Sequence, residues 1–199
     1  MPPPDRPRWL RELDAGDAPV YGLKAANLGS LIRGGFPVPP GFAITADDCE
    51  TFLDASGAAA AVRALPAPFS ADPDVARELG AFDDLAERLT AEVEGRAMPP
   101  DLAATVGAAY RELCLDAGGD VPVAVRSSGP ASHPGLFQTD LDVRGTAAVL
   151  DAVVRVWASI YCTAGLVSRA REGRPLEREP IGVAVQRMVD AETSGVMFT

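Results

Sequence analysis

Hydrophobic positions recur at helical spacing in several stretches of the chain. Apolar residues three and four positions apart predict helices over about 24–33, 46–55, 74–94, 100–117 and 146–171. The first of these begins at Lys24 and is followed by Gly34-Gly35, a typical helix end. Thr45 and Asp48 have the spacing of a capping box before the second. The longest helices carry charged residues opposite their apolar stripe, which predicts one packed and one solvent-exposed side.

Short apolar runs between turn signals predict strands. They cover 121–125, 139–143, 181–189 and 195–199, and a proline-rich extended segment over 36–45 leads into another. Residues 1–19 are rich in proline and charge, and we expect an irregular arm there.

Composition narrows the class of protein. The 199 residues are 47% hydrophobic and 6% aromatic, so the core is built mostly from aliphatic side chains. A net charge of -10 argues against a nucleic-acid surface. The three cysteines are widely spaced, which favours a reducing compartment. No run is apolar and long enough for a signal peptide or a membrane span, so we expect a cytoplasmic protein.

Several common sites are absent from the sequence. It contains neither G-x-x-x-x-G-K-[ST] nor G-x-G-x-x-G. The single histidine, His133, cannot build a histidine-based metal cluster, and its loop context does not favour a Ser-His-Asp triad. We therefore expect no metal site made by these residues.

A phosphate-binding element is the strongest chemical signal. The strand over 121–125 is followed by Arg126, whose guanidinium group can donate two hydrogen bonds to a phosphate. The small residues that follow, Ser127, Ser128, Gly129 and Gly135, let backbone N–H groups approach an anion. From these residues alone, a flexible turn with a surface arginine explains the pattern equally well.

Two further segments have the same ambiguity. Lys24 lies in the first turn of a helix, where the helix dipole favours an anion, but it also fits a solvated surface lysine. Gln186, Met188 and Val189 close a strand, where an adenine ring is often bound. Taken alone, Met188 is more typical of a core.

Seven segments, in order, resemble the N-terminal nucleotide-binding domain of phosphoenolpyruvate synthase and pyruvate, phosphate dikinase, which rifamycin-type antibiotic phosphotransferases share. The resemblance covers about residue 20 to the last residue. The segments are GLKAANLG (22–29), GFPVPPGF (35–42), VRSS (125–128), PGLFQT (134–139), VWAS (156–159), VQRMV (185–189) and SGVMFT (194–199).

The resemblance implies an α+β, ATP-grasp-like fold with mixed sheets covered by helices. In this fold ATP lies between two α+β lobes, and residues 20–199 are the first part. A helix-and-strand lobe covers about 20–120, and the phosphate-lid and adenine-side strands cover about 121–199. The implied catalytic residues, both contacting ATP phosphates, are Lys24 and Arg126. The lid is the loop 127–137, which includes Ser127, Ser128 and Gly135. Gln138 and Thr139 border the phosphates, while Gln186, Met188 and Val189 line the adenine side.

In the related enzymes the β-phosphate of ATP moves to a histidine on a separate domain and then to a small acceptor. The resemblance thus implies ATP and Mg²⁺ as cofactors. The magnesium ligands, the Thr-x-x-His phosphocarrier motif and the acceptor-binding barrel lie outside this sequence. A split enzyme, completed by a second polypeptide, is the reading we favour, and we also expect a second chain or a second copy to cover the open edge.

The sequence departs from the family pattern at four positions. Leu23 replaces a glycine, Pro130 an arginine, His133 a methionine and Gln138 an aspartate. The loss of an arginine removes a phosphate ligand. A non-catalytic nucleotide-binding or regulatory module and a fragment of a longer enzyme are therefore the alternative interpretations.

Overall fold

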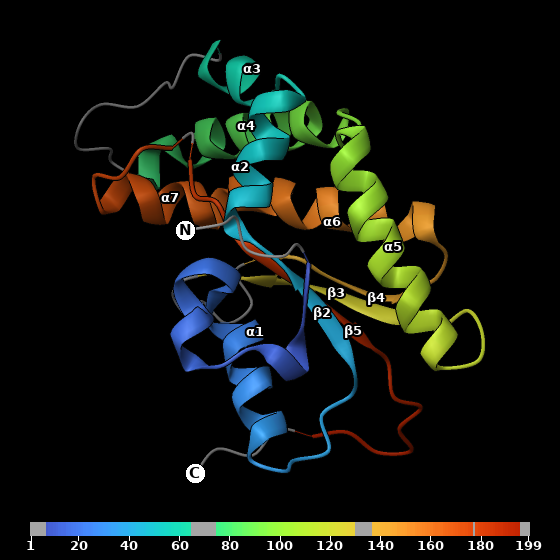
Figure 1. Ribbon diagram of the computed structural model, residues 1–199. Helices are drawn as coiled ribbons and strands as arrows, with labels where there is room; N and C mark the ends of the chain where they lie inside the picture. Colours follow the sequence, from blue (N-terminus) through green and yellow to red (C-terminus); the bar gives the residue numbers. More distant parts are fainter. Residues whose placement is uncertain (1–6, 65–74, 130–136, 177, 196–199) are drawn as a thin grey trace.

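The computed structural model of the protein describes residues 7–64, 75–129, 137–176 and 178–195. Within these ranges the chain has an α+β fold, as the sequence predicts (Figure 1). The strands are β1 (Arg8–Trp9), β2 (Gly41–Ile44), β3 (Val123–Ser128), β4 (Thr139–Val143) and β5 (Gly182–Arg187). The α-helices are α1 (Ala18–Arg33), α2 (Ala46–Ala55), α3 (Ala58–Ala64), α4 (Val75–Glu94), α5 (Pro100–Asp116), α6 (Thr146–Ala158) and α7 (Thr163–Arg171). Three short 3₁₀ helices are η1 (Leu10–Glu12), η2 (Ala15–Asp17) and η3 (Ser159–Tyr161).

The described strands form one sheet in the order β1-β2-β5-β3-β4. Every pairing in it is antiparallel, which corrects the expectation of mixed sheets. The reason lies in β5, which inserts between β2 and β3 and runs opposite to both. Strands from the first and the second half of the chain therefore share one sheet.

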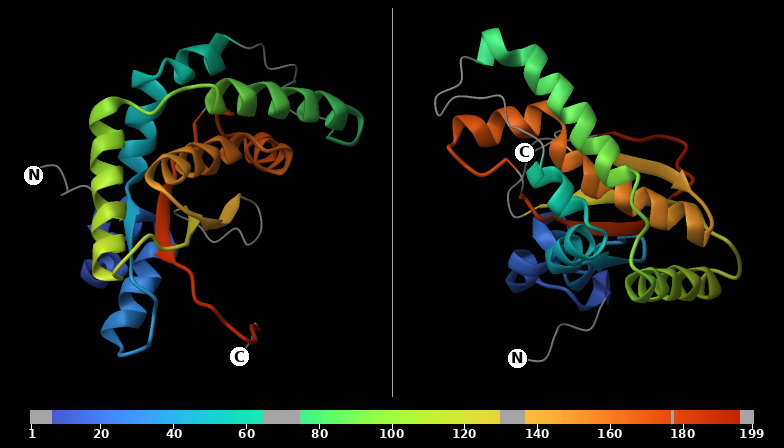
Figure 2. Two further views of the ribbon diagram at one scale, coloured as in Figure 1. Left: turned by 90° about the vertical axis from the view of Figure 1, so that its right-hand side faces the viewer. Right: turned by 90° about the horizontal axis from the view of Figure 1, so that it is seen from above.

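The two faces of the sheet are covered differently. The larger core lies on the side of α2 and α6, where the rings of Phe52 and Trp157 stack with centroids 5.2 Å apart. Helix α4 packs on α6 and α7 and forms an outer layer (Figure 2). The other face carries α1 and a smaller core around Tyr21 and Ala184.

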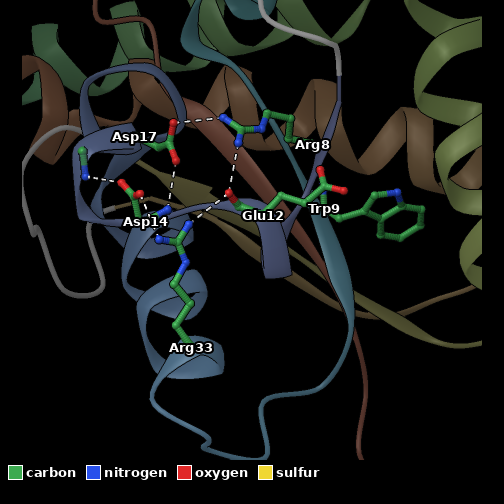
Figure 3. Close-up of polar contacts among 7 residues, drawn as sticks. Arg8, Trp9, Glu12, Asp14, Asp17 and Arg33 are labelled. Atoms are coloured by element: carbon green, nitrogen blue, oxygen red, sulfur yellow. Dashed lines mark hydrogen bonds and ion pairs between the residues drawn. The ribbon is translucent and has the colours of Figure 1, made fainter.

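Residues 8–17, expected to be irregular, form β1, η1 and η2. Leu10 and Leu13 are fully buried and complete the small core beside α1. Ion pairs fix this segment: Arg8 binds Asp17 at 3.0 Å (Figure 3). The neighbouring pair, Asp14 with Arg33, ties it to the end of α1 at 3.1 Å. These stabilising contacts are tertiary, so local composition did not predict them.

Most other elements agree with the hydrophobic pattern. Thr45 caps α2 by accepting from the Asp48 N–H at 3.0 Å, while Asp48 accepts from the Thr45 N–H. The helix predicted over 146–171 is instead broken, because Cys162 is extended and its Sγ accepts from the Gly165 N–H to begin α7. No described residue after β5 is in a strand, and 196–199 lie outside the described residues.

Among the described residues no single helix is both long and apolar enough to cross a membrane. The bent pair Thr146–Tyr161 and Thr163–Arg171 together has the necessary length and composition.

Candidate phosphate and nucleotide site

The candidate site begins where α1 meets the end of β3. Gly22 breaks α1 with φ 80° and ψ 160°, a conformation open essentially only to glycine. A Cβ on Gly22 would lie 1.9 Å from the Ser128 carbonyl oxygen. Two hydrogen bonds join α1 to the end of β3. The Leu23 N–H donates to the Gly129 carbonyl at 2.9 Å, and the Ala25 N–H donates to the Ser128 hydroxyl at 3.0 Å. The helical segment that contains Lys24 therefore starts directly on β3.

This junction corrects two expectations. Strand β3 continues through Ser127 to Ser128, so these serines are not part of a loop. The serine at the junction, Ser128, caps the helix with its hydroxyl, and the N–H groups of Leu23 and Ala25 are already bonded within the protein. An anion at this place would therefore be held by the Lys24 side chain rather than by these two N–H groups.

Arg126 lies on the face of the sheet that α1 covers. It is opposite Ala184 on β5 and Thr139 on β4, and directly opposite residues share a face. Its Nε atom is buried and has no hydrogen-bond partner in the described part of the chain. A buried guanidinium nitrogen without a partner is costly, so a ligand acceptor at this position would be stabilising.

Lys24 and Arg126 form a pair of like charges. The pKa of Lys24 is lowered from its ordinary value, mainly by desolvation and further by the charge of Arg126. Neither side chain has an acidic partner within the described ranges. Two neighbouring cations without an anion create a positive site, which suits a phosphate chain.

The residues at the start of β4 are divided between the two faces. Thr139, opposite Arg126, is exposed on the α1 side. The Gln138 side-chain amide instead donates to the Asp140 carboxylate at 2.6 Å, and Asp140 is paired with Arg155 of α6. The structure thus places Thr139 beside Arg126 and turns the Gln138 side chain towards α6.

The predicted adenine side is located at the end of β5. Gln186 is opposite Ala124 and so lies on the same face as Arg126, two positions along. Its side-chain N–H donates to the Pro39 carbonyl at 3.1 Å, and only 8% of the residue is exposed. The Met188 N–H donates to the Pro122 carbonyl at 2.9 Å, and Val189 is 60% exposed.

The described residues add no other predicted site residue to this face of the sheet. Ser127 is opposite Val183, so its side chain points to the larger core. Gly135 lies outside the described residues. Sequence reasoning missed the carbonyl of Pro39 and the Asp140–Arg155 pair. The proline-rich segment was the available signal for the first, because consecutive prolines keep a backbone extended and its carbonyls unpaired.

A metal centre is not evident in this site. In residues 7–64, 75–129, 137–176 and 178–195, no three His, Cys, Asp or Glu side chains lie close enough together to hold an ion.

The reactivity of Lys24 gives a direct test of the positive site. Lys24 is the only lysine in the sequence, so its amine can be followed by competitive acetylation and mass spectrometry. We expect the pKa of Lys24 to lie below its ordinary value, and ATP to raise this pKa by favouring the ammonium form. At pH values between the lowered pKa of Lys24 in the folded protein and its ordinary pKa in the unfolded chain, the unfolded chain binds more protons. In that pH range Lys24 therefore makes the free energy of unfolding rise with pH.

The Arg126→Gln variant is the control for this titration. It should move the pKa of Lys24 partly back towards its ordinary value, because one cause of the shift is removed. An unshifted pKa in the unmodified protein, or one that ATP leaves unchanged, would contradict the paired-cation site.

Comparison of the sequence with known proteins places the chain in a family. Residues 18–199 match the family described as "Pyruvate phosphate dikinase, AMP/ATP-binding domain". The chain is 36% identical over 200 residues to a probable phosphoenolpyruvate synthase of Staphylothermus marinus and 34% identical over 197 residues to one of Archaeoglobus fulgidus. It is 32% identical over 226 residues to the phosphoenolpyruvate synthase of Pyrococcus furiosus.

These matches cover nearly all of this chain but only a small part of each relative. Each alignment covers 96% of this chain, but only 23%, 26% and 28% of the respective relatives. The chain thus spans about a quarter of the length of the curated relatives it matches. Because the family match extends from α1 to the last residue, the chain belongs to the family of pyruvate phosphate dikinase AMP/ATP-binding domains.

Proposed function

We propose that this chain binds ATP on the α1 face of the sheet, with the phosphates beside Lys24 and Arg126 and the adenine towards Gln186, Met188 and Val189. The observation that carries the proposal is the pair of neighbouring cations, with the buried Arg126 Nε lacking a partner in the described residues. Charge-assisted hydrogen bonds to phosphate oxygens would satisfy this atom and offset the repulsion between the cations. Family membership supports the same ligand.

The proposed fold of the complete site is an ATP-grasp, with ATP held between this part and a second lobe. The exposed position of Thr139, opposite Arg126, and of Val189, which follows β5, supports it, since both leave surface for a covering element. The segment 129–137, which follows β3 and includes Gly135, is proposed as the phosphate lid. For Ser127 and Ser128 we propose a role through the backbone, because their side chains are engaged elsewhere.

The proposed reaction is phosphoryl transfer. The β-phosphoryl group of ATP passes to a histidine of a partner domain and AMP leaves, while the γ-phosphoryl group is transferred to water and leaves as inorganic phosphate. The phosphohistidine then phosphorylates a small acceptor. The relatives named phosphoenolpyruvate synthase support this reaction class, and their greater length supports a partner domain on the same or a second polypeptide. In this chain Lys24 and Arg126 would neutralise the charge of the phosphates.

Magnesium is proposed to accompany ATP, where it would screen the phosphate charges. The residues described here do not form a ligand cluster for it, so we place no magnesium ligand among them and derive no step through the metal. A cytoplasmic location is also proposed. Cys49, Cys114 and Cys162, all within the described residues, form no disulfide with one another, which agrees with a reducing compartment.

Calorimetry combined with product analysis tests this function. We expect the full chain to bind ATP with magnesium and to release no AMP, and AMP to appear once a co-purifying polypeptide with a phosphohistidine domain is added. The absence of any binding heat would contradict the ATP site, and AMP release by the chain alone would contradict the need for a partner. Binding without AMP release in the presence of the partner would favour a non-catalytic nucleotide-binding module.

A further inference from the structure

The carboxylate of Asp140 connects the start of β4 with α6. Its Oδ2 accepts from Nε and Nη2 of Arg155 at 2.8 and 2.7 Å. Its Oδ1 accepts from the side-chain amide of Gln138 at 2.6 Å. The Asp140 side chain is only 13% exposed, so these partners replace most of its hydrogen bonds to water. One buried carboxylate thus bridges a helix and the residue that precedes β4.

A second connection holds the backbone of Gln138. The Gln138 N–H donates to the Ser159 hydroxyl at 3.1 Å, and that hydroxyl donates to the Val156 carbonyl at 2.7 Å. Ser159 is buried, at 8% exposed, in η3 directly after α6. Gln138 is therefore held by both its main chain and its side chain to one helical segment.

The consequence concerns the neighbouring Thr139. Because Gln138 and Asp140 are both directed towards α6, the residue between them is directed to the opposite face, where it lies opposite Arg126. A β-bulge across from Ala124 separates this arrangement from the rest of β4, with Asp142 at φ 54°. The pairing of Val123 with Val143, on the other side of the bulge, therefore does not by itself fix the position of Thr139.

We propose that Asp140, Arg155 and Ser159 are positioning residues that hold Gln138, and thereby keep Thr139 beside Arg126 at the end of the site that takes the β- and γ-phosphates of a nucleoside triphosphate. The inference rests on the proposed function for its ligand. The anchoring itself is a property of the free protein. The two parts are therefore tested by separate measurements.

Hydrogen exchange of the free, full-length chain tests the anchoring. We expect Asp140→Asn and Ser159→Ala to accelerate exchange of the Gln138 amide about 10-fold, while β5 amides stay unchanged. Asp142→Asn is the matched control: it makes the same chemical change on the same strand, and asparagine tolerates positive φ. Unchanged exchange at Gln138, or equal acceleration across the sheet, would overturn the proposal.

Nucleotide affinities test the positioning. We expect Asp140→Asn and Arg155→Gln each to weaken ATP binding about 10-fold and AMP binding less than about 2-fold, since only the distal phosphates lose their geometry. The double variant should match the single ones, and Arg155→Lys should retain most of the ATP affinity because it keeps a donor for Asp140.

The outcomes separate the two proposals. Equal losses for ATP and AMP would indicate a merely structural role and overturn the positioning. If the unmodified chain binds neither nucleotide, the proposed function fails, while selective exchange at Gln138 still decides the anchoring. Selective loss of ATP together with selective exchange supports both.

Discussion

The Arg126→Gln variant is expected to bind ATP about 100-fold more weakly than the unmodified chain, a loss of about 3 kcal/mol. The guanidinium group supplies charge and a donor, Nε, that has no partner in the described residues, so a phosphate is its natural acceptor. Glutamine keeps a similar length but no charge. Isothermal titration with ATP and magnesium measures the change.

The stability of the same variant distinguishes a ligand-binding arginine from a structural one. In the free protein Arg126 contributes to the lowered pKa of Lys24, which means that the two cations repel each other. Removing Arg126 should therefore leave the melting temperature unchanged or raise it slightly. Arg171→Gln, at an exposed position in the last turn of α7, is the matched control and should alter neither property. A melting temperature that falls together with the ATP affinity would contradict the assignment.

The Gly22→Ala variant is expected to lose about 4 kcal/mol of unfolding free energy, and roughly 10 °C in melting temperature. Two effects add: the backbone at φ 80° and ψ 160° is strained for alanine, and the new Cβ would lie 1.9 Å from the Ser128 carbonyl oxygen. This oxygen belongs to a central strand and cannot move aside. Thermal or urea unfolding followed by circular dichroism measures the loss.

The matched control is Gly35→Ala. Gly35 also has φ 80°, but no atom lies within 4 Å of its prospective Cβ. It should therefore lose only the conformational part, about 1 kcal/mol. Similar losses for the two variants would show that the contact between α1 and β3 contributes little, and would weaken the basis for placing Lys24 beside Arg126.

The elements that the sequence predicted well are those with local causes. The helix α2 begins where Thr45 and Asp48 can cap each other, which depends on four consecutive residues. The bounds of β4, Thr139–Val143, follow from alternating residues after a proline- and glycine-rich loop. Local chemistry was sufficient in both cases.

The site residues that were placed wrongly depend on distant partners. By residue type, Ser127 and Ser128 look like loop residues. They instead belong to β3, because they pair with Val183 and Gly182 of β5. The orientation of Gln138 depends on Asp140 and its partner in α6. Neither contact is visible in the spacing of residues. The pairing of Lys24 with Arg126 came from family resemblance, whereas their lack of an acidic partner among the described residues is a structural result.

The place of β5 in the sheet also governs when the molecule can fold during synthesis. Strands β2 and β3 are bonded to β5 and not to each other, yet β5 is the last strand described. Until residues 182–187 leave the ribosome, the sheet can contain only the separate pairs β1–β2 and β3–β4. Gly182, against which the Tyr21 backbone packs, is also still missing at that stage. Most sheet contacts then form at once and over long sequence separations, which slows folding. A nascent chain of this protein thus leaves the facing edges of β2 and β3 unpaired until β5 emerges, and its protection from aggregation depends on β5.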